Sequence, residues 1–186
     1  MTSTTAPKSI RRVVVGSKDG VPTVLSDASS VRTFEHLPTF SNTLIWTTPS
    51  VPKVGPHQLA ADPVPSNTNF LPPPGGTSFM IVTFPPEAQM ADPSFDGASF
   101  GAEVAAKVPG LAQTFEREDP TMHTTDTVDY GVVLEGEIWL DLGGEEVHLK
   151  QHDVVIQNGA RHGWRNKSNN PVMMLFVLIG AQRQAS

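Results

Sequence analysis

The amino-acid sequence predicts an all-β domain of short antiparallel strands joined by many turns. Proline (17 residues) and glycine (15 residues) are frequent among the 186 residues, and only 17% are charged, which favours short strands over long amphipathic helices. From Val128 onward, extended segments and polar or glycine turns alternate about every 8–12 residues, which is typical of a sandwich or barrel. This length suits one domain with one core, which we expect at residues 9–186 after a flexible tail at residues 1–8.

The first half of the chain contains fewer expected strands and one long loop. Strands are predicted at residues 11–15 and 22–25, on either side of the turn Ser-Lys-Asp-Gly, and again at residues 43–48 and 78–84. Eight prolines in residues 49–76 predict an irregular loop, and a loop of that length usually covers a site or an interface.

One short helix is expected between Phe95 and Phe115. Alanines and apolar residues recur there at helical spacing, and Pro109-Gly110 closes the segment. Beyond it, glycine pairs and polar residues mark the turns between strands. These later strands are expected at residues 128–134, 137–142, 145–150, 154–157, 161–166 and 171–180.

The charge balance and the absence of cysteine limit the partners of the protein. A net charge of −6 without any run of Lys or Arg argues against binding to nucleic acid or anionic lipid, and favours a small-molecule partner. Because there are no cysteines, a metal would need imidazole or carboxylate ligands. No apolar run has the length of a signal peptide or membrane helix, so we expect a soluble, cytoplasmic protein.

A first motif lies in residues 122–142, where one histidine stands among threonines and aspartates before a strand, a glycine turn and a second strand. Its spaced residues are His123, Thr125, Asp129 and Gly136. The segment resembles the first motif of the cupin superfamily, in which two histidines one residue apart precede a glutamate and, seven residues after it, a glycine. In this sequence Thr125 stands at the second histidine position and Asp129 at the glutamate position.

A second motif follows in the same order as in that family. Gly159, His162 and Asn166 match its glycine, histidine and asparagine, while Gln157 stands where the family usually has proline. The resemblance is close over residues 121–181, and it implies a cupin-type double-stranded β-helix, that is, a jelly-roll barrel with the one short helix and the long proline-rich loop added.

The resemblance also implies a site inside the barrel. His123 and Thr125, two residues apart, would face the same side of one strand, and Asp129 and His162 would join them from other strands. His123, Asp129 and His162 would then form a ligand and catalytic set of two imidazoles and one carboxylate. Such a set is associated with non-haem Fe(II) and also suits Mn(II), Ni(II) or Zn(II).

Two alternatives to this triad stay open. With one histidine lost and a shorter carboxylate, the site could be free of metal, and its histidines would then be hydrogen-bonded interior groups or acid–base catalysts. Asp126 is a competing carboxylate ligand three residues after His123, although an aspartate in a turn often only caps the backbone.

Four further residues are candidates for contact with a substrate. Thr125 faces the interior with His123, and Trp164, two residues after His162, would offer a flat apolar wall unless it is plain core. Gly131 would leave open volume beside Asp129, or else allow close packing. Gln157 could make one hydrogen bond near the rim. The apolar surroundings predict a largely hydrophobic substrate with a few polar groups.

The other four histidines give weaker signals. His148 and His152 are expected at the surface, the first on a strand and the second in a turn. His57 could reach the barrel mouth if the proline-rich loop folds over it, whereas His36 has no informative context.

These observations favour a small-molecule enzyme, which the resemblance implies would be a metal-dependent cupin. Decarboxylation, dehydration or isomerisation of a carbonyl-bearing or phenolic substrate is the leading interpretation. A non-haem iron dioxygenase and a metal-free ligand-binding protein are the alternatives. The resemblance further implies a homodimer, to which a strand at residues 11–15 could contribute.

Overall fold

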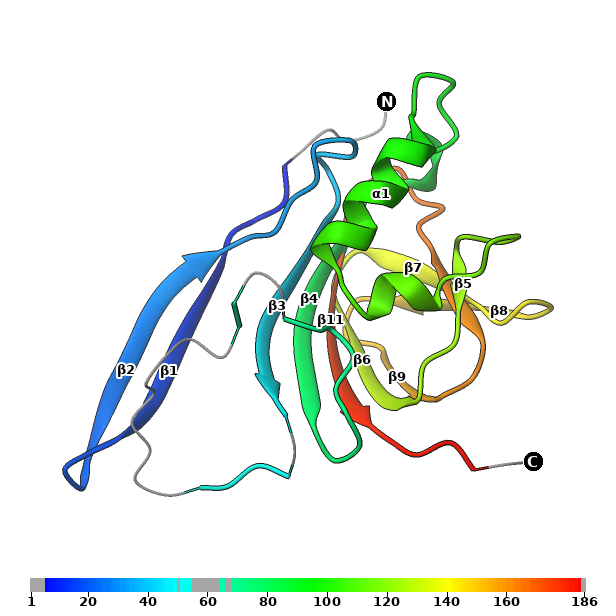
Figure 1. The fold of residues 1–186 in the computed structure, drawn as a ribbon. Helices are drawn as coiled ribbons and strands as arrows, with labels where there is room; N and C mark the ends of the chain where they lie inside the picture. The colour runs from blue at the N-terminus through cyan, green and yellow to red at the C-terminus, as the bar shows by residue number, and fades with distance from the viewer. Residues whose placement is uncertain (1–5, 50, 55–63, 66–67, 185–186) are drawn as a thin grey trace.

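The fold is a barrel of two antiparallel sheets that face each other, with one helix across an open side (Figure 1). A computed structural model describes residues 6–49, 51–54, 64–65 and 68–184. The five-stranded sheet has the order β3-β4-β11-β6-β9, and the four-stranded sheet has the order β5-β10-β7-β8. The larger sheet consists of β3 (Ser41–Thr48), β4 (Thr77–Phe84), β11 (Val172–Gly180), β6 (Thr127–Glu135) and β9 (Val154–Asn158).

The smaller sheet completes the barrel with four short strands. The turn between β6 and β7 contains Gly136, whose φ of 87° favours a residue without a side chain. The all-β fold class is therefore confirmed, and the strands from residue 127 onward follow the order predicted from the turns. The strands of the smaller sheet are β5 (Met122–His123), β10 (His162–Arg165), β7 (Glu137–Asp141) and β8 (Glu146–Lys150).

Helix α1 (Gly97–Lys107) lies across one opening of the barrel. Asp96 caps its first turn by accepting a hydrogen bond from the Ser99 amide at 3.0 Å. Short 3-10 helices, η1 (Glu87–Gln89) and η2 (Leu111–Thr114), flank it. The expected helix is thus present, and Pro109 and Gly110 follow its last turn.

A cluster around Glu103 fastens α1 to the segment that precedes β3. The Glu103 carboxylate accepts hydrogen bonds from the Glu35 amide at 2.8 Å, the His36 amide at 3.1 Å and the Lys107 ammonium at 2.6 Å. The His36 ring lies 2.9 Å from the same carboxylate. Burial alone would raise the pKa of Glu103, but these donors outweigh it and lower that pKa to about 2.

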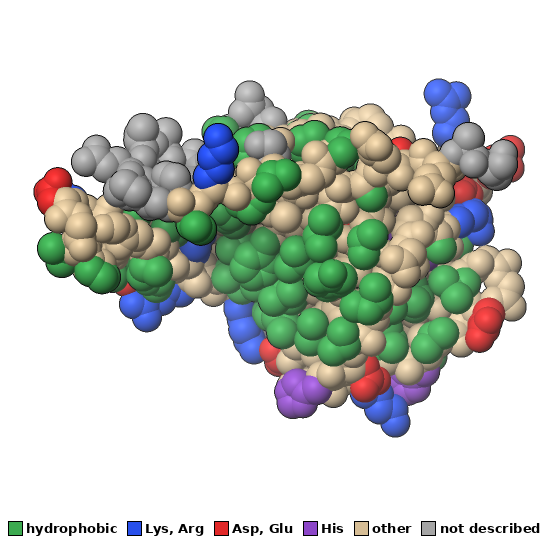
Figure 2. All heavy atoms as spheres, turned by 90° about the horizontal axis from the view of Figure 1, so that it is seen from below, with side chains coloured by type: hydrophobic (Ala, Val, Ile, Leu, Met, Phe, Trp, Pro, Cys, Tyr) green, Lys and Arg blue, Asp and Glu red, His purple; other side chains and the backbone are tan. Residues whose placement is uncertain are grey.

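Strands β1 (Ile10–Lys18) and β2 (Val21–Ser30) form a hairpin that stands away from the barrel (Figure 1). Both are longer than predicted, because the pairing continues beyond the expected residues on each side of the turn. Arg12 ties the hairpin to β3, since its guanidinium donates to the Ile45 carbonyl at 3.1 Å. In Figure 2 the hairpin protrudes from the barrel and carries hydrophobic side chains along one edge.

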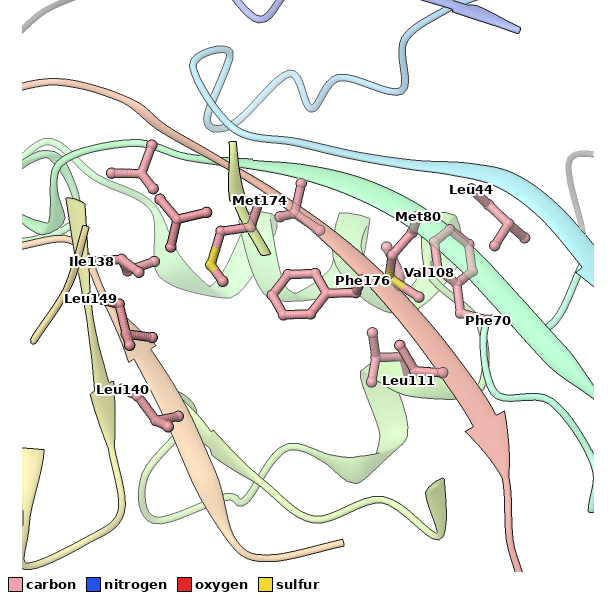
Figure 3. Close-up of a cluster of buried hydrophobic side chains, with 14 of the residues drawn as sticks. Leu44, Phe70, Met80, Val108, Leu111, Ile138, Leu140, Leu149, Met174 and Phe176 are labelled. Carbon is pink, nitrogen blue, oxygen red and sulfur yellow. The ribbon is translucent and has the colours of Figure 1, made fainter. Parts of the chain in front are cut away.

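The hydrophobic core lies between the sheets and α1 (Figure 3). Met80, Met174 and Ile138 are fully buried strand residues, and alternate positions of β11 point into this core. The proline-rich loop has no helix or strand among its described residues, yet its Phe70 is fully buried in the core. Across the described segments, no helix is long and apolar enough to span a membrane.

Candidate functional site

A cavity of about 540 Å³ occupies the interior of the barrel. This volume is in the range of small-molecule sites. Seven of the residues predicted to form the site lie on its wall, and they come from β5 and the residues after it, from β6, from β9 and from β10. They are His123, Thr125, Asp129, Gly131, Gln157, His162 and Trp164.

Two histidines lie side by side on the wall of this cavity. His123 on β5 and His162 on β10 are directly paired in register, and their ring centroids are 4.3 Å apart. His162 Nδ1 lies 3.0 Å from the Ala160 carbonyl oxygen, to which it donates, and this hydrogen bond fixes the ring and leaves Nε2 available. His123 Nδ1 is buried without a hydrogen-bond partner.

Both imidazoles are held in the neutral form. Burial and, to a smaller extent, the neighbouring His162 ring together lower the pKa of His123 to about 3, against an opposing effect of Glu116. Burial also lowers the pKa of His162, although the hydrogen bond to Ala160 opposes this effect. A neutral imidazole can accept a proton or bind a metal ion, so both kinds of chemistry are open to this pair.

A carboxylate and an amide form a second polar pair. Asp129 on β6 lies directly opposite Gln157 on β9, and both side chains are buried. Asp129 Oδ1 and Gln157 Nε2 each lack a hydrogen-bond partner, although one is an acceptor and the other a donor. Burial raises the pKa of Asp129 to about 6, against a lowering contribution from a hydrogen bond with Thr127.

The predicted ligand triad is only partly assembled. Among the described residues, no three His, Cys, Asp or Glu side chains are grouped closely enough to hold one metal ion. His123 and His162 stand as a pair of ligands could, but the Asp129 carboxylate does not join them. These three side chains therefore do not fit a three-ligand centre in the arrangement described.

Aromatic rings form the walls around the polar groups. Phe115 stacks on the His123 ring at a centroid distance of 4.6 Å, and Trp164 meets the His162 ring edge-on at 5.9 Å. Trp164 also contacts Phe176 at 5.4 Å. The cavity wall therefore combines a few polar side chains with a large apolar surface.

Residues 113–178 match the family model of the cupin domain. This segment contains the histidine pair as well as Asp129 and Gln157, and it folds into the barrel expected for that family. Over these residues the chain is similar to a cupin domain.

Several fungal proteins share this segment. Oryzines biosynthesis cluster protein J of Aspergillus oryzae is 51% identical over 66 residues, which cover 34% of this chain and 37% of that protein. Phomopsin biosynthesis cluster protein C' of Diaporthe leptostromiformis is 49% identical over 63 residues, 33% of each chain. Cupin-domain-containing oxidoreductase virC of Hypocrea virens is 40% identical over 62 residues, 31% of this chain and 32% of that protein. The matched segment thus spans about a third of the length of these relatives.

Among solved structures, an ethanolamine utilization protein from Salmonella typhimurium aligns over 95% of this chain and 100% of its own chain. Its sequence identity is 12% and its TM-score is 0.43.

Gly131 and Thr125 differ in detail from the expectation. A Cβ at Gly131 would lie 2.8 Å from Val155 and 3.3 Å from Phe176, so the space beside this glycine is filled, and the close-packing interpretation applies. Thr125 follows the two-residue strand β5 instead of sharing it with His123. It is nevertheless buried, and its hydroxyl lies 2.7 Å from that of Thr127.

Asp126 and three of the other histidines lie away from the cavity wall. Asp126 is exposed and pairs with Arg183 at 2.6 Å, so its carboxylate is engaged at the surface of the protein. His148 pairs with Glu137 at 2.9 Å on β8, and His152 occupies a turn with a φ of 75°. His36 binds Glu103, as described above, and His57 lies outside the described residues.

Sequence reasoning missed other residues of the cavity wall. Asn42 on β3 is buried and lines the cavity, and its Oδ1 has no hydrogen-bond partner. Because β3 begins with the three polar residues Ser-Asn-Thr, no local pattern distinguished Asn42 from its neighbours. Phe95 and Phe100 reach the cavity from α1 and the segment before it, which no local pattern could reveal, since the contact depends on where the helix docks.

Proposed function

We propose that this protein is an enzyme that binds a largely apolar small molecule and moves a proton at a carbonyl or phenolic group of that molecule. One observation carries the proposal: on the wall of a largely apolar cavity, four polar side chains keep a buried atom without a hydrogen-bond partner. Buried polar atoms are normally satisfied, so unpartnered atoms at this place suit the polar groups of a ligand. The four residues are Asn42, His123, Asp129 and Gln157.

The second polar pair restricts the chemistry of that ligand. Gln157 can donate a hydrogen bond while Asp129, directly opposite, can accept one. A carbonyl adjacent to a hydroxyl or an enolisable carbon satisfies both groups at once. The aromatic walls suit an aryl or polyene body attached to this polar end.

The two neutral imidazoles supply a proton acceptor on the wall of the same cavity. His123 can remove a proton from the substrate, and the Gln157 amide can donate to the oxygen on which negative charge develops. The Ala160 carbonyl keeps the His162 ring in one orientation, so its Nε2 faces a fixed direction. Decarboxylation, dehydration and isomerisation can each proceed through such a stabilised oxyanion.

A metal-dependent reaction at the same place is the second candidate. The relatives named cupin-domain-containing oxidoreductases favour it, and so does the hydrogen bond from His162 to a backbone carbonyl, because histidines that bind metals usually donate their other ring N–H in this way. Asp129 would have to move toward His123 and His162 to complete the ligand set. An Fe(II), Mn(II), Ni(II) or Zn(II) ion there would supply Lewis-acid or, for iron, oxygen chemistry.

The test follows proton exchange at a probe ketone. The protein is dialysed against EDTA and incubated in D2O with acetophenone or 2′-hydroxyacetophenone, and proton NMR measures the loss of the methyl signal next to the carbonyl. We expect exchange above the buffer rate, a loss of about a hundredfold in His123→Gln, and no change in the control His148→Gln, whose ring is on the outer surface.

Other outcomes would redirect the assignment. Exchange or oxygen uptake that requires one of the four added metal ions would refute the metal-free reaction in favour of the second candidate. Binding of the probes without any reaction, with or without metal, would identify a ligand-binding protein. Failure to bind any aryl ketone would overturn the substrate class.

A further inference from the structure

Asn42 is a buried amide on the cavity wall that the proposed proton transfer does not use. It is only 6% exposed, and it lines the cavity from β3, where it pairs with Val82 on β4. Among the described residues, its Oδ1 has no hydrogen-bond partner. A buried acceptor without a partner costs free energy in the folded protein, so a role outside the fold itself is needed to explain it.

A second buried asparagine on the same wall shows what a structural role looks like. Asn166 Nδ2 donates to the Phe84 carbonyl at 3.0 Å and to the Asn170 carbonyl at 2.8 Å. Its Oδ1 accepts from the Ser168 amide at 3.0 Å. The Asn166 amide thus joins the last residue of β4 to the turn before β11. The Oδ1 of Asn42 holds no backbone segment in this way, and it is open to a donor from a ligand.

The strand pairing places Asn42 far from the carboxylate of the Asp129–Gln157 pair. One row of the larger sheet runs from Asn42 through β4 and β11 to Val133 on β6, and Asp129 lies four positions before Val133. Three strand spacings across the sheet and four residues along it each correspond to about 14 Å. The curvature of the sheet and the inward direction of both side chains reduce the gap between their polar atoms to roughly 10–15 Å.

The wall between these two positions is apolar. Met80 on β4 and Phe176 on β11 line the cavity there. Phe40, two residues before Asn42, lines the cavity together with Phe100 on α1, and these two rings meet edge-on at a centroid distance of 5.7 Å. The middle of the wall therefore suits an apolar body, and the rings near Asn42 suit a second aromatic ring.

We propose that Asn42 selects the substrate by accepting a hydrogen bond from a hydroxyl or N–H group at its far end. The inference rests on the proposed function, which places the reacting carbonyl or phenol at Asp129 and Gln157. Two hydrogen bonds of about 2.8 Å take up part of the gap, so the two polar groups of the ligand lie roughly 4–9 Å apart. An aryl ketone that carries a hydroxyl on a second ring has this span. The substrate class thus narrows to two-ring molecules with a polar group at each end.

Isothermal titration calorimetry with two matched ligands tests this role. 2′-Hydroxydihydrochalcone and 2′,4-dihydroxydihydrochalcone share the hydroxyaryl ketone, and only the second carries a hydroxyl on the far ring. We expect wild-type protein to bind the second ligand about tenfold more tightly, as one hydrogen bond to a buried acceptor allows. Asn42→Leu is close in size and lacks the acceptor, so the preference should vanish. The control Asn169→Leu, at an exposed position before β11, should keep it.

Thermal unfolding without ligand separates recognition from a structural role. Because the Asn42 Oδ1 holds no partner among the described residues, Asn42→Leu should melt at the wild-type temperature or above it. Asn166→Leu should melt at a lower temperature, since its three backbone hydrogen bonds are lost. A fall in melting temperature for Asn42→Leu as large as that for Asn166→Leu would show that both amides hold the barrel together, and would overturn the proposal.

The binding results distinguish this inference from the proposed function. Equal affinities of wild-type protein for the two ligands would overturn the role of Asn42, whichever variants fold, and would leave the proposed function standing. A preference that persists in Asn42→Leu would also refute it. Binding of neither ligand would overturn the two-ring substrate class. The expected preference without proton exchange at the methylene next to the carbonyl would support the role of Asn42 and refute only the metal-free reaction.

Discussion

Replacing Glu103 by glutamine should release the fastening of helix α1. The side chain is only 10% exposed, and four donors from Glu35, His36 and Lys107 surround its carboxylate. Their combined effect lowers its pKa from 4.5 to about 2. Because a tenfold change in proton affinity corresponds to about 1.4 kcal/mol, the ionised group contributes at most about 3 kcal/mol, and about 2 kcal/mol once screening near the surface is allowed for.

The sign of the pH dependence follows from the lowered pKa. The contribution of Glu103 is fully present above about pH 4.5, the value of the unfolded chain, and it is lost as the pH falls toward about 2. Glu103→Gln should therefore reduce the free energy of unfolding by about 2 kcal/mol at pH 7, and the difference from wild type should shrink by more than half at pH 3.

Urea unfolding followed by circular dichroism at both pH values measures this difference. Glu118→Gln is the matched control, because Glu118 is exposed and its substitution should change stability little. A loss below about 0.5 kcal/mol for Glu103→Gln at pH 7, or a loss that is the same at pH 3, would show that the carboxylate does not fasten the helix as argued.

Three further predictions concern the cavity. Burial raises the pKa of Asp129 from 3.8 to about 6, so the folded protein is stabilised by the protonated carboxyl below about pH 3.8 and loses that stability as the pH rises through 6. In EDTA-treated protein, urea unfolding should show Asp129→Asn to be up to about 3 kcal/mol more stable than wild type at pH 8 but not at pH 4. Equal stability of the two proteins at both pH values would contradict this prediction. Gly131→Ala should lower the free energy of unfolding by about 1–3 kcal/mol, because its Cβ would press on the Val155 side chain. An unchanged melting temperature would show that Val155 can move aside without cost. Binding of 2′-hydroxyacetophenone should quench Trp164 fluorescence, measured as the difference between wild type and Trp164→Phe, and an unchanged difference would place the ligand elsewhere.

The strand order of the barrel could be predicted because it follows from short-range signals. Glycine and polar turns at Gly136, Gly143 and Gly159 separate apolar segments, and the pairing of β7 with β8 connects neighbours in the sequence. The resemblance to the two cupin motifs implied that His123 and His162 share one site, and both residues line the same cavity.

Features that depend on long-range docking could not be predicted in this way. The contact between His36 and Glu103 joins residues 67 positions apart, and the inward orientation of Asn42 is set by its pairing with β4. In the sequence, Asp126 competes with Asp129 for the place of the carboxylate ligand. Only the extended backbone of β6 turns one toward the cavity and leaves the other to Arg183 at the surface.

The way in which α1 is attached has a kinetic consequence. Phe100 and Val104 line the cavity from this helix, yet none of its eleven residues is fully buried. A segment with so little buried surface can detach at a lower free energy than the whole domain needs to unfold. Molecules can then enter and leave the barrel while its strands remain paired. The residence time of a bound molecule depends on how often eleven residues lift away, as well as on its contacts with the histidines.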